Sequence, residues 1–207
     1  MYEIPQKGLE IFKNNSKPFH EIYIDDQSKL TLHGLHQFYV EIEEKEKTKQ
    51  LMLLLEKLNY NQAIIFTSKV DRAKFLNRIL NKMEFESIAI FRGMSQQKRI
   101  ENYNLFKECK KRIIVTTNLF SRGIDIERVN VVINYDMSES DDTYLHRVGR
   151  AGRYGTKGIA ISFVTTTEEK GILKTIQDRF VVQIKEMPEK IDESLYSKIN
   201  KETIKML

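Results

Sequence analysis

The sequence predicts an α/β fold, namely a doubly wound, mostly parallel sheet with helices on both faces. From Gln62 onward, short β-branched runs alternate with longer segments that have a helical period. These runs are largely apolar, without the polar alternation of a half-exposed strand, which is typical of strands covered on both faces. Regular alternation of strand and helix indicates right-handed βαβ units, and hence a doubly wound sheet.

Six runs are expected to form the strands of this sheet. They are Gln37–Ile42, Ala63–Phe66, Ser87–Phe91, Arg112–Thr116, Val129–Ile133 and Gly158–Val164.

Four helices are expected between these strands. The first covers Lys47 to Leu58, and its inner face carries Leu51, Leu54, Leu55 and Leu58. The second has inward positions at spacings of three and four, which are Val70, Ala73, Leu76, Ile79, Leu80 and Met83. The third is capped by Ser95 and is expected to turn Ile100, Tyr103 and Phe106 inward. The fourth begins near Asp141.

The chain is expected to divide into three parts. Residues 1–31 contain Pro5, Pro18 and paired Asn and Asp residues, which favour turns, so we expect a linker-like N-terminal arm. Residues 32–191 would form the α/β domain, and residues 192–207 a C-terminal helical tail.

Composition sets limits on the class of protein. The 207 residues suffice for one packed core, and the net charge of +5 permits a nucleic-acid partner without requiring one. The single cysteine, Cys109, excludes a disulfide framework within the chain and favours a reducing compartment. No apolar run approaches the ~20 residues of a membrane span, and the N-terminus lacks a signal-peptide core. We therefore expect an intracellular protein without a membrane partner.

Ligands of open α/β sheets gather where strands end, so polar side chains that follow the expected strands are candidates for a binding site. The first unusual segment is Arg92–Arg99, which combines Gly93, a helix start, Gln96 and Arg99. Glycine amides and helix N-termini bind phosphate oxygens, which suits a nucleic-acid backbone. An ordinary capped helix with a solvated basic face would have the same sequence.

The second segment is Thr116–Asp125. Thr117 has a hydroxyl that could donate to phosphate, Gly123 allows close backbone approach, and Asp125 could accept from ribose hydroxyls or hold an arginine. An ordinary loop with a capping aspartate explains the pattern equally well.

The third segment is the run from His146 to Arg153. Arginines recur at every third position, with Gly149 and Gly152 between them. Small residues beside planar guanidinium groups allow two of these groups to converge on one anion, so the run predicts phosphate binding. The alternative is a charged helix end with salt bridges to local aspartates.

For three other features of the sequence we expect no role in catalysis or metal binding. The chain has no Gly-x-x-x-x-Gly-Lys-Ser/Thr loop, so it lacks the cradle that grips nucleotide phosphates and positions magnesium. Asp136 follows an expected strand, but without that loop we interpret it as structural rather than as a magnesium ligand. His33 and His36 have the spacing of half a metal site without further ligands, so no zinc site is expected.

In this order and at these separations, the segments resemble the C-terminal RecA-like domain of DEAD-box ATP-dependent RNA helicases. Four family motifs are matched, by Ala63–Ser68 (motif IV), Gln96–Arg99 (Gln-x-x-Arg), Thr116–Asp125 (motif V) and His146–Arg153 (motif VI). Flanking sequence segments, such as Thr117–Phe120 and Asp125–Asn130, resemble those of the family's nuclear branch, which acts in pre-mRNA splicing and mRNA export.

The resemblance implies a role for each matched residue. Arg150 and Arg153 would point at the γ-phosphate of an ATP held, with its Mg²⁺, mainly by an N-terminal RecA-like domain absent from this chain, and His146 would couple the two domains. Gly123 and Asp125 would meet the nucleotide, and Arg122 would brace the loop. The RNA backbone would be met by Gly93, Gln96, Arg99 and Thr117. No role is assigned to Asn118, where the family often has aspartate.

The predicted function is therefore half of an RNA-stimulated ATPase, inactive in isolation. Its implied partners are RNA, the N-terminal RecA-like domain, and splicing and export factors, in the nucleus. One alternative is a stand-alone, non-catalytic module that binds RNA or protein. Another alternative is the corresponding domain of a DNA translocase. The sequence from Asn118 to Asn130 resembles RNA helicases and so argues against it.

Overall fold

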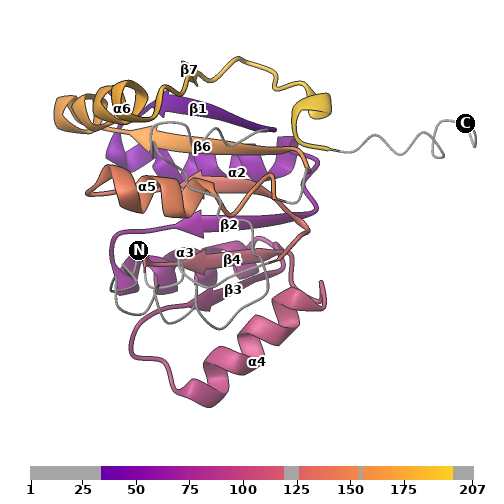
Figure 1. Cartoon of the computed structure of the whole chain (residues 1–207). Helices are drawn as coiled ribbons and strands as arrows, with labels where there is room; N and C mark the ends of the chain where they lie inside the picture. Colours follow the sequence, from indigo (N-terminus) through magenta and orange to yellow (C-terminus); the bar gives the residue numbers. More distant parts are fainter. Residues whose placement is uncertain (1–33, 119–125, 154–155, 198–207) are drawn as a thin grey trace, which may run out of the picture.

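The structure is a computed structural model and describes residues 34–118, 126–153 and 156–197 (Figure 1). Seven strands are present in the described part of the chain: β1 (Leu35–Glu41), β2 (Gln62–Phe66), β3 (Ser87–Ile90), β4 (Ile113–Thr116), β5 (Val129–Asn134), β6 (Gly158–Val164) and β7 (Ile184–Glu186). The α-helices described are α2 (Lys47–Lys57), α3 (Val70–Lys82), α4 (Gln96–Lys107), α5 (Asp141–Val148) and α6 (Thr167–Phe180). Two short 3-10 helices, η2 (Glu44–Glu46) and η4 (Glu193–Leu195), complete the order.

The strands form one sheet in the order β3-β4-β2-β5-β6-β1-β7. Every neighbouring pair is parallel. The predicted parallel sheet is therefore confirmed. The central strands β2, β4, β5 and β6 are also buried along their whole length, as expected of strands covered on both faces.

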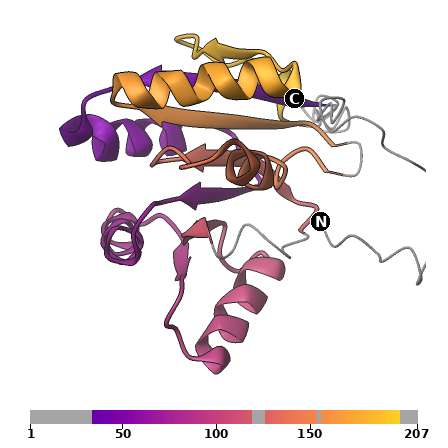
Figure 2. The same ribbon diagram turned by 60° about the vertical axis from the view of Figure 1, so that its left-hand side comes forward.

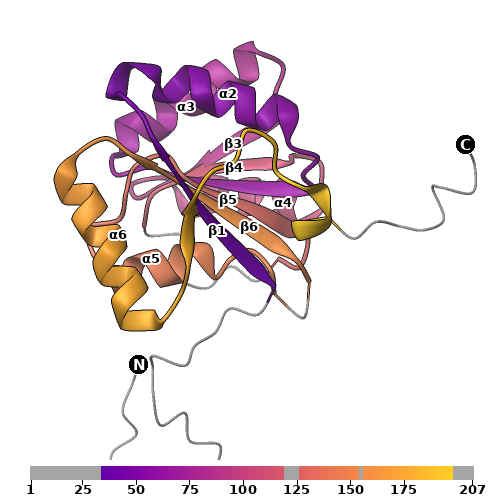
Figure 3. The ribbon, with the colours of Figure 1, turned by 90° about the horizontal axis from the view of Figure 1, so that it is seen from above.

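Helices cover both faces of the sheet, as a doubly wound fold requires. One core packs α2 and α3 against one face, through side chains such as Leu51, Leu76 and Ile65. The other packs α4, α5 and α6 against the opposite face, through Phe106, Tyr144 and Ile176. Figure 3 shows α2 and α3 together on one side and α5 and α6 on the other.

Two inward positions were predicted wrongly. Ile100 is 50% exposed and Met83 is 52% exposed. Helix α4 packs beside the edge strand β3 (Figure 2), where its contact with the sheet is narrow. There the buried residue is Asn102, whose amide donates to the carbonyl of Ala89 at 2.9 Å and so satisfies an acceptor near the open edge.

Besides the short 3-10 helices, one strand and one α-helix lie beyond those predicted. Strand β7 is only three residues long, too short to have a period. Helix α6 did carry a sequence signal, which is the capping-box spacing of Thr166 and Glu169. The hydroxyl of Thr166 accepts from the amide of Glu169 at 3.2 Å, and the carboxylate of Glu169 accepts from the amide of Thr165 at 2.6 Å. None of the described helices is both long and apolar enough to cross a membrane. The domain limits at residues 31 and 191 stay a prediction.

Candidate functional site

The first predicted segment lies between β3 and α4. Ser95 is the N-cap of α4 and accepts from the amide of Lys98 at 3.3 Å, as expected. Gln96 is exposed in the first turn. The side chain of Arg99 is partly covered, and its Nε is buried without a hydrogen-bond partner among the described residues. Gly93 lies in the turn before the helix. The segment therefore presents an amide side chain and a cation at a helix start.

The second predicted segment begins directly after β4. Thr117 is 8% exposed, so little of it reaches the surface. The next residue, Asn118, accepts a hydrogen bond from the Nε of Arg147 at 2.8 Å. Arg122, Gly123 and Asp125 lie outside the described residues, so their predicted roles stay predictions.

The third segment comprises the last turn of α5 and the residues that follow it. His146 is exposed in that turn. The Nε of Arg150 donates to the carbonyl of His146 at 3.0 Å, and the Nε of Arg153 donates to the carbonyl of Gly149 at 2.8 Å. Each guanidinium group is thus tethered to the backbone four residues earlier, which limits the directions it can take.

Two glycines hold this segment against the sheet. Gly152 has a φ of +69°, in the left-handed region that favours glycine. A Cβ on Gly158, the first residue of β6, would lie 2.6 Å from the amide nitrogen of Gly152. The turn between Arg150 and Arg153 therefore packs on the start of β6 at a distance that only glycine permits.

Arg147 has a different role from the other arginines of the run. It is 1% exposed, and its guanidinium lies 5.2 Å from the ring centre of Phe66. Besides Asn118, it donates to the Oδ1 of Asn134 at 3.3 Å and to the carbonyl of Asp136 at 2.8 Å. The spacing of the arginines grouped Arg147 with Arg150 and Arg153 as a phosphate-binding candidate. Its burial shows that it belongs to the interior of the domain.

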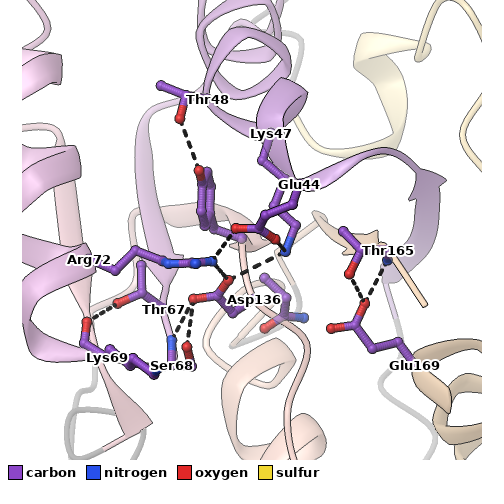
Figure 4. Close-up of polar contacts among 12 residues, drawn as sticks. Glu44, Lys47, Thr48, Thr67, Ser68, Lys69, Arg72, Asp136, Thr165 and Glu169 are labelled. Atoms are coloured by element: carbon purple, nitrogen blue, oxygen red, sulfur yellow. Dashed lines mark hydrogen bonds and ion pairs between the residues drawn. The ribbon is translucent and has the colours of Figure 1, made fainter.

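Asp136 is structural, as predicted, and its carboxylate is fully engaged (Figure 4). One oxygen accepts from the amide of Ser68 at 2.7 Å and from its hydroxyl at 3.0 Å. The other faces Arg72 and, at 3.4 Å, the Nζ of the buried Lys47. Glu44 completes the cluster with contacts to both cations. These bonds join the segments after β2 and β5 to α2 and α3.

The structure brings only some of the candidates together. Arg147 and Asp136 link the ends of β2, β4 and β5 to α5 through hydrogen bonds. By contrast, Gly93, Gln96 and Arg99 lie at α4, which packs on the edge strand β3, whereas α5 packs on β5 and α6. The candidates thus form two groups, one at α4 and one around α5.

The doubly wound parallel sheet has the RecA-like fold of helicase C-terminal domains. The chain belongs to the helicase conserved C-terminal domain family, whose model matches residues 46–155.

Relatives and solved structures agree with this assignment. The chain is 57% identical over 176 residues to DEAD-box ATP-dependent RNA helicase 15 of Arabidopsis thaliana, a match covering 85% of this chain and 41% of that protein. It therefore spans less than half the length of such relatives. Among solved structures, S. cerevisiae Dbp5 bound to RNA and ADP BeF3 matches with a TM-score of 0.75 at 30% identity, over 79% of this chain and 44% of that one. The isolated C-terminal domain of the DEAD-box protein Dbp5 matches with a TM-score of 0.71 at 30% identity, over 86% of this chain and 100% of that one.

Proposed function

We propose that this chain is the C-terminal half of a DEAD-box ATP-dependent RNA helicase, which supplies arginine fingers to ATP and half of an RNA-binding groove. One observation carries the proposal. Arg150 and Arg153 lie on one short segment, and each has its Nε tethered to a backbone carbonyl. Guanidinium groups held in this way are prepared to meet one phosphate when the partner domain closes.

The arginines act on the charge that develops during phosphoryl transfer. ATP would be gripped by an N-terminal RecA-like domain, and closure would bring Arg150 and Arg153 to its γ-phosphate, with His146 at the domain contact. Gly123 and Asp125 would complete the nucleotide contacts, and Arg122 would brace their loop. An arginine finger accelerates phosphoryl transfer by about 10³ to 10⁵, or roughly 4 to 7 kcal/mol at 1.36 kcal/mol per tenfold.

We expect the protein ligands of Mg²⁺ to lie in the N-terminal RecA-like domain and not in this chain. Mg²⁺ prefers carboxylates and phosphate oxygens. The strand-end carboxylate of Asp136 is already occupied by Ser68, Lys47 and Arg72. Within the described ranges, no three acidic, histidine or cysteine side chains converge on a metal position. The Mg²⁺ that accompanies ATP would neutralise phosphate charge from the N-terminal domain.

RNA would be held through its sugar-phosphate backbone. Gly93, Gln96 and Arg99 would contact one stretch of the strand from α4, and Thr117 another from the end of β4. Backbone contacts give little sequence preference and an affinity that falls with salt. Support comes from the helix start at Gln96, where unpaired amides favour anions.

The cellular role follows from the resemblance to the splicing and export branch. We propose that the full-length protein acts on messenger RNA in the nucleus, with splicing and export factors as partners. The high identity to relatives named as RNA helicases supports the action on RNA.

The test is RNA-stimulated ATPase of the full-length protein carrying Arg150→Ala or Arg153→Ala. A matched control is Arg78→Ala, because Arg78 is exposed on α3 and faces Phe75, 5.9 Å away. We expect each finger variant to lose about 10³-fold or more in rate and the control to keep its rate. A wild-type rate in Arg150→Ala would end the finger assignment. The 207-residue chain alone should not hydrolyse ATP.

A further inference from the structure

Arg147 is a buried cation whose hydrogen-bond acceptors carry no charge. Its Nε and one terminal nitrogen both donate to the Oδ1 of Asn118. The other terminal nitrogen donates to the Oδ1 of Asn134 and to the backbone carbonyl of Asp136. The guanidinium group is therefore held in a fixed orientation by oxygen atoms of three residues.

Arg147 and its acceptor Asn118 lie in segments to which the proposed function gives separate tasks. Asn118 directly follows Thr117, the proposed RNA contact at the end of β4. Arg147 itself lies between His146 and Arg150, on the proposed ATP segment. One buried side chain thus joins the start of the RNA-directed loop to the helix that directly precedes the fingers.

Asp136 extends this connection to a third segment. Its backbone carbonyl accepts from Arg147 at 2.8 Å, while its carboxylate accepts from the amide of Ser68 at 2.7 Å. Ser68 lies just after β2. The ends of β2, β4 and β5 are therefore bound to α5 through two adjacent groups of Asp136 and one guanidinium.

The energetics argue against a role in stability alone. Burial is the main cause that lowers the pKa of Arg147 to about 10, against the opposing effects of the Asp136 and Glu139 carboxylates. A buried cation without a dedicated carboxylate is costly, and an apolar side chain of similar volume is often as stable in such a place. Local features that disfavour stability are expected at functional sites.

We infer that Arg147 is a positioning residue that, through Asn118, couples RNA contact at Thr117 to the placement of Arg150 and Arg153. This rests on the proposed function. RNA bound at the end of β4 fixes Asn118, Asn118 fixes the guanidinium of Arg147, and α5 then holds the fingers in place. Without this link, RNA still binds and ATP is still hydrolysed slowly, but RNA no longer accelerates hydrolysis.

The experiment measures the ratio of ATPase rates with and without saturating RNA, in the full-length protein. The variants are Arg147→Lys, which keeps the charge and loses the planar fork, Asn118→Ala, and both together. Asn118 is at the surface, so Asn118→Ala leaves no buried cavity and remains informative if Arg147→Lys fails to fold. Tyr144→Phe is the control, since it removes a buried hydrogen bond of the same helix that does not involve Arg147.

Each single variant should lower the stimulation ratio between about 5-fold and 150-fold, with nucleotide-free RNA affinity nearly unchanged. The double variant should be no worse than the stronger single one, because both remove the same link. Tyr144→Phe should keep the ratio even where it lowers the unfolding midpoint.

A wild-type ratio in Asn118→Ala or Arg147→Lys would overturn this inference and leave the proposed function intact. Effects that multiply in the double variant would also overturn it, since the two residues would then act separately. A wild-type protein without RNA-stimulated ATPase would instead overturn the proposed function, and this inference with it.

Discussion

Asp136 accepts hydrogen bonds from both the amide and the hydroxyl of Ser68, at 2.7 and 3.0 Å, across 68 residues of sequence. Ser68 follows the strand of motif IV, whereas Asp136 follows β5. The carboxylate therefore fixes the position of one strand end relative to another. Because the buried Lys47 and the partly exposed Arg72 lie against the same carboxylate, its charge also neutralises part of theirs.

Removing that charge should destabilise the domain. Asp136→Asn would leave the Nζ of the buried Lys47 with only the half-exposed Glu44, at 2.9 Å, as its carboxylate partner. Losing charged hydrogen bonds of this kind costs about 1.5 to 3 kcal/mol. Urea unfolding of the chain measures the change. Asp71→Asn is the control, because Asp71 is exposed and its contact with Lys74 is 3.7 Å long, and it should change the free energy by less than about 0.5 kcal/mol. Equal effects of the two variants would contradict the structural role of Asp136.

Tyr144 predicts a dependence of stability on alkaline pH. Burial raises the pKa of Tyr144 above its ordinary value of 10.0. A raised pKa in the folded state gives stability that is complete below pH 10 and is lost as the pH rises above it, because only the unfolded chain then releases the proton readily.

Tyr144→Phe should therefore flatten the decline of unfolding free energy above about pH 10. At neutral pH it should cost about 1 to 3 kcal/mol, because the Oε1 of Gln37 loses the hydroxyl that donates to it at 2.8 Å. Unfolding by denaturant at pH 7 and at stepped alkaline pH measures both effects. An unchanged alkaline slope would mean that burial of Tyr144 does not control this titration.

The sheet could be predicted from sequence because its signals are local. The strands predicted at Ala63, Val129 and Gly158 are rich in apolar residues and lie in the middle of the sheet. The links between segments could not be predicted in the same way. Arg147 and Asn118 are 29 residues apart, and no local pattern distinguishes a buried arginine from the two that follow at the same spacing. Asn118 was assigned no role because the family often has aspartate at its position, and its contact with Arg147 is defined only by the fold.

Gly158→Ala should impair the arginine segment. An added Cβ would lie 2.6 Å from the amide nitrogen of Gly152 and 2.9 Å from the Cβ of Ala151, so the turn between Arg150 and Arg153 must move. A shift of about 1 Å at a catalytic group can cost about 100-fold in rate. RNA-stimulated ATPase of the full-length protein measures the loss. Gly171→Ala in α6 is the control, since a Cβ there meets no atom within 4 Å. Equal rates in the two variants would show that the packing at Gly158 does not place the fingers.

Val181→Gly should stabilise the domain. Val181 ends α6 with a φ of +52°, in the left-handed region that β-branched residues disfavour by roughly 1 to 2 kcal/mol. The side chain is 77% exposed, so its removal sacrifices little burial. We expect a gain of about 1 kcal/mol in unfolding free energy. Val181→Ala is the comparison, because alanine keeps most of the penalty at positive φ and should gain less. A loss of stability in Val181→Gly would show that the valine is not strained.

Alanine substitutions of Arg99 and Gln96 should weaken RNA binding in different ways. If both contact the RNA backbone, Arg99→Ala should lower affinity and reduce the slope of log affinity against log salt by about 0.7, because one phosphate neutralisation is lost. Gln96→Ala should lower affinity without changing that slope, since an amide releases no counterion. Binding of a fluorescent single-stranded RNA to the full-length protein, titrated at several salt concentrations, separates the two effects. Lys82→Ala controls for net charge, because Lys82 is exposed in the last turn of α3 on the other side of the sheet. If Lys82→Ala changes the slope as much as Arg99→Ala does, the charge at α4 acts only as part of the overall field.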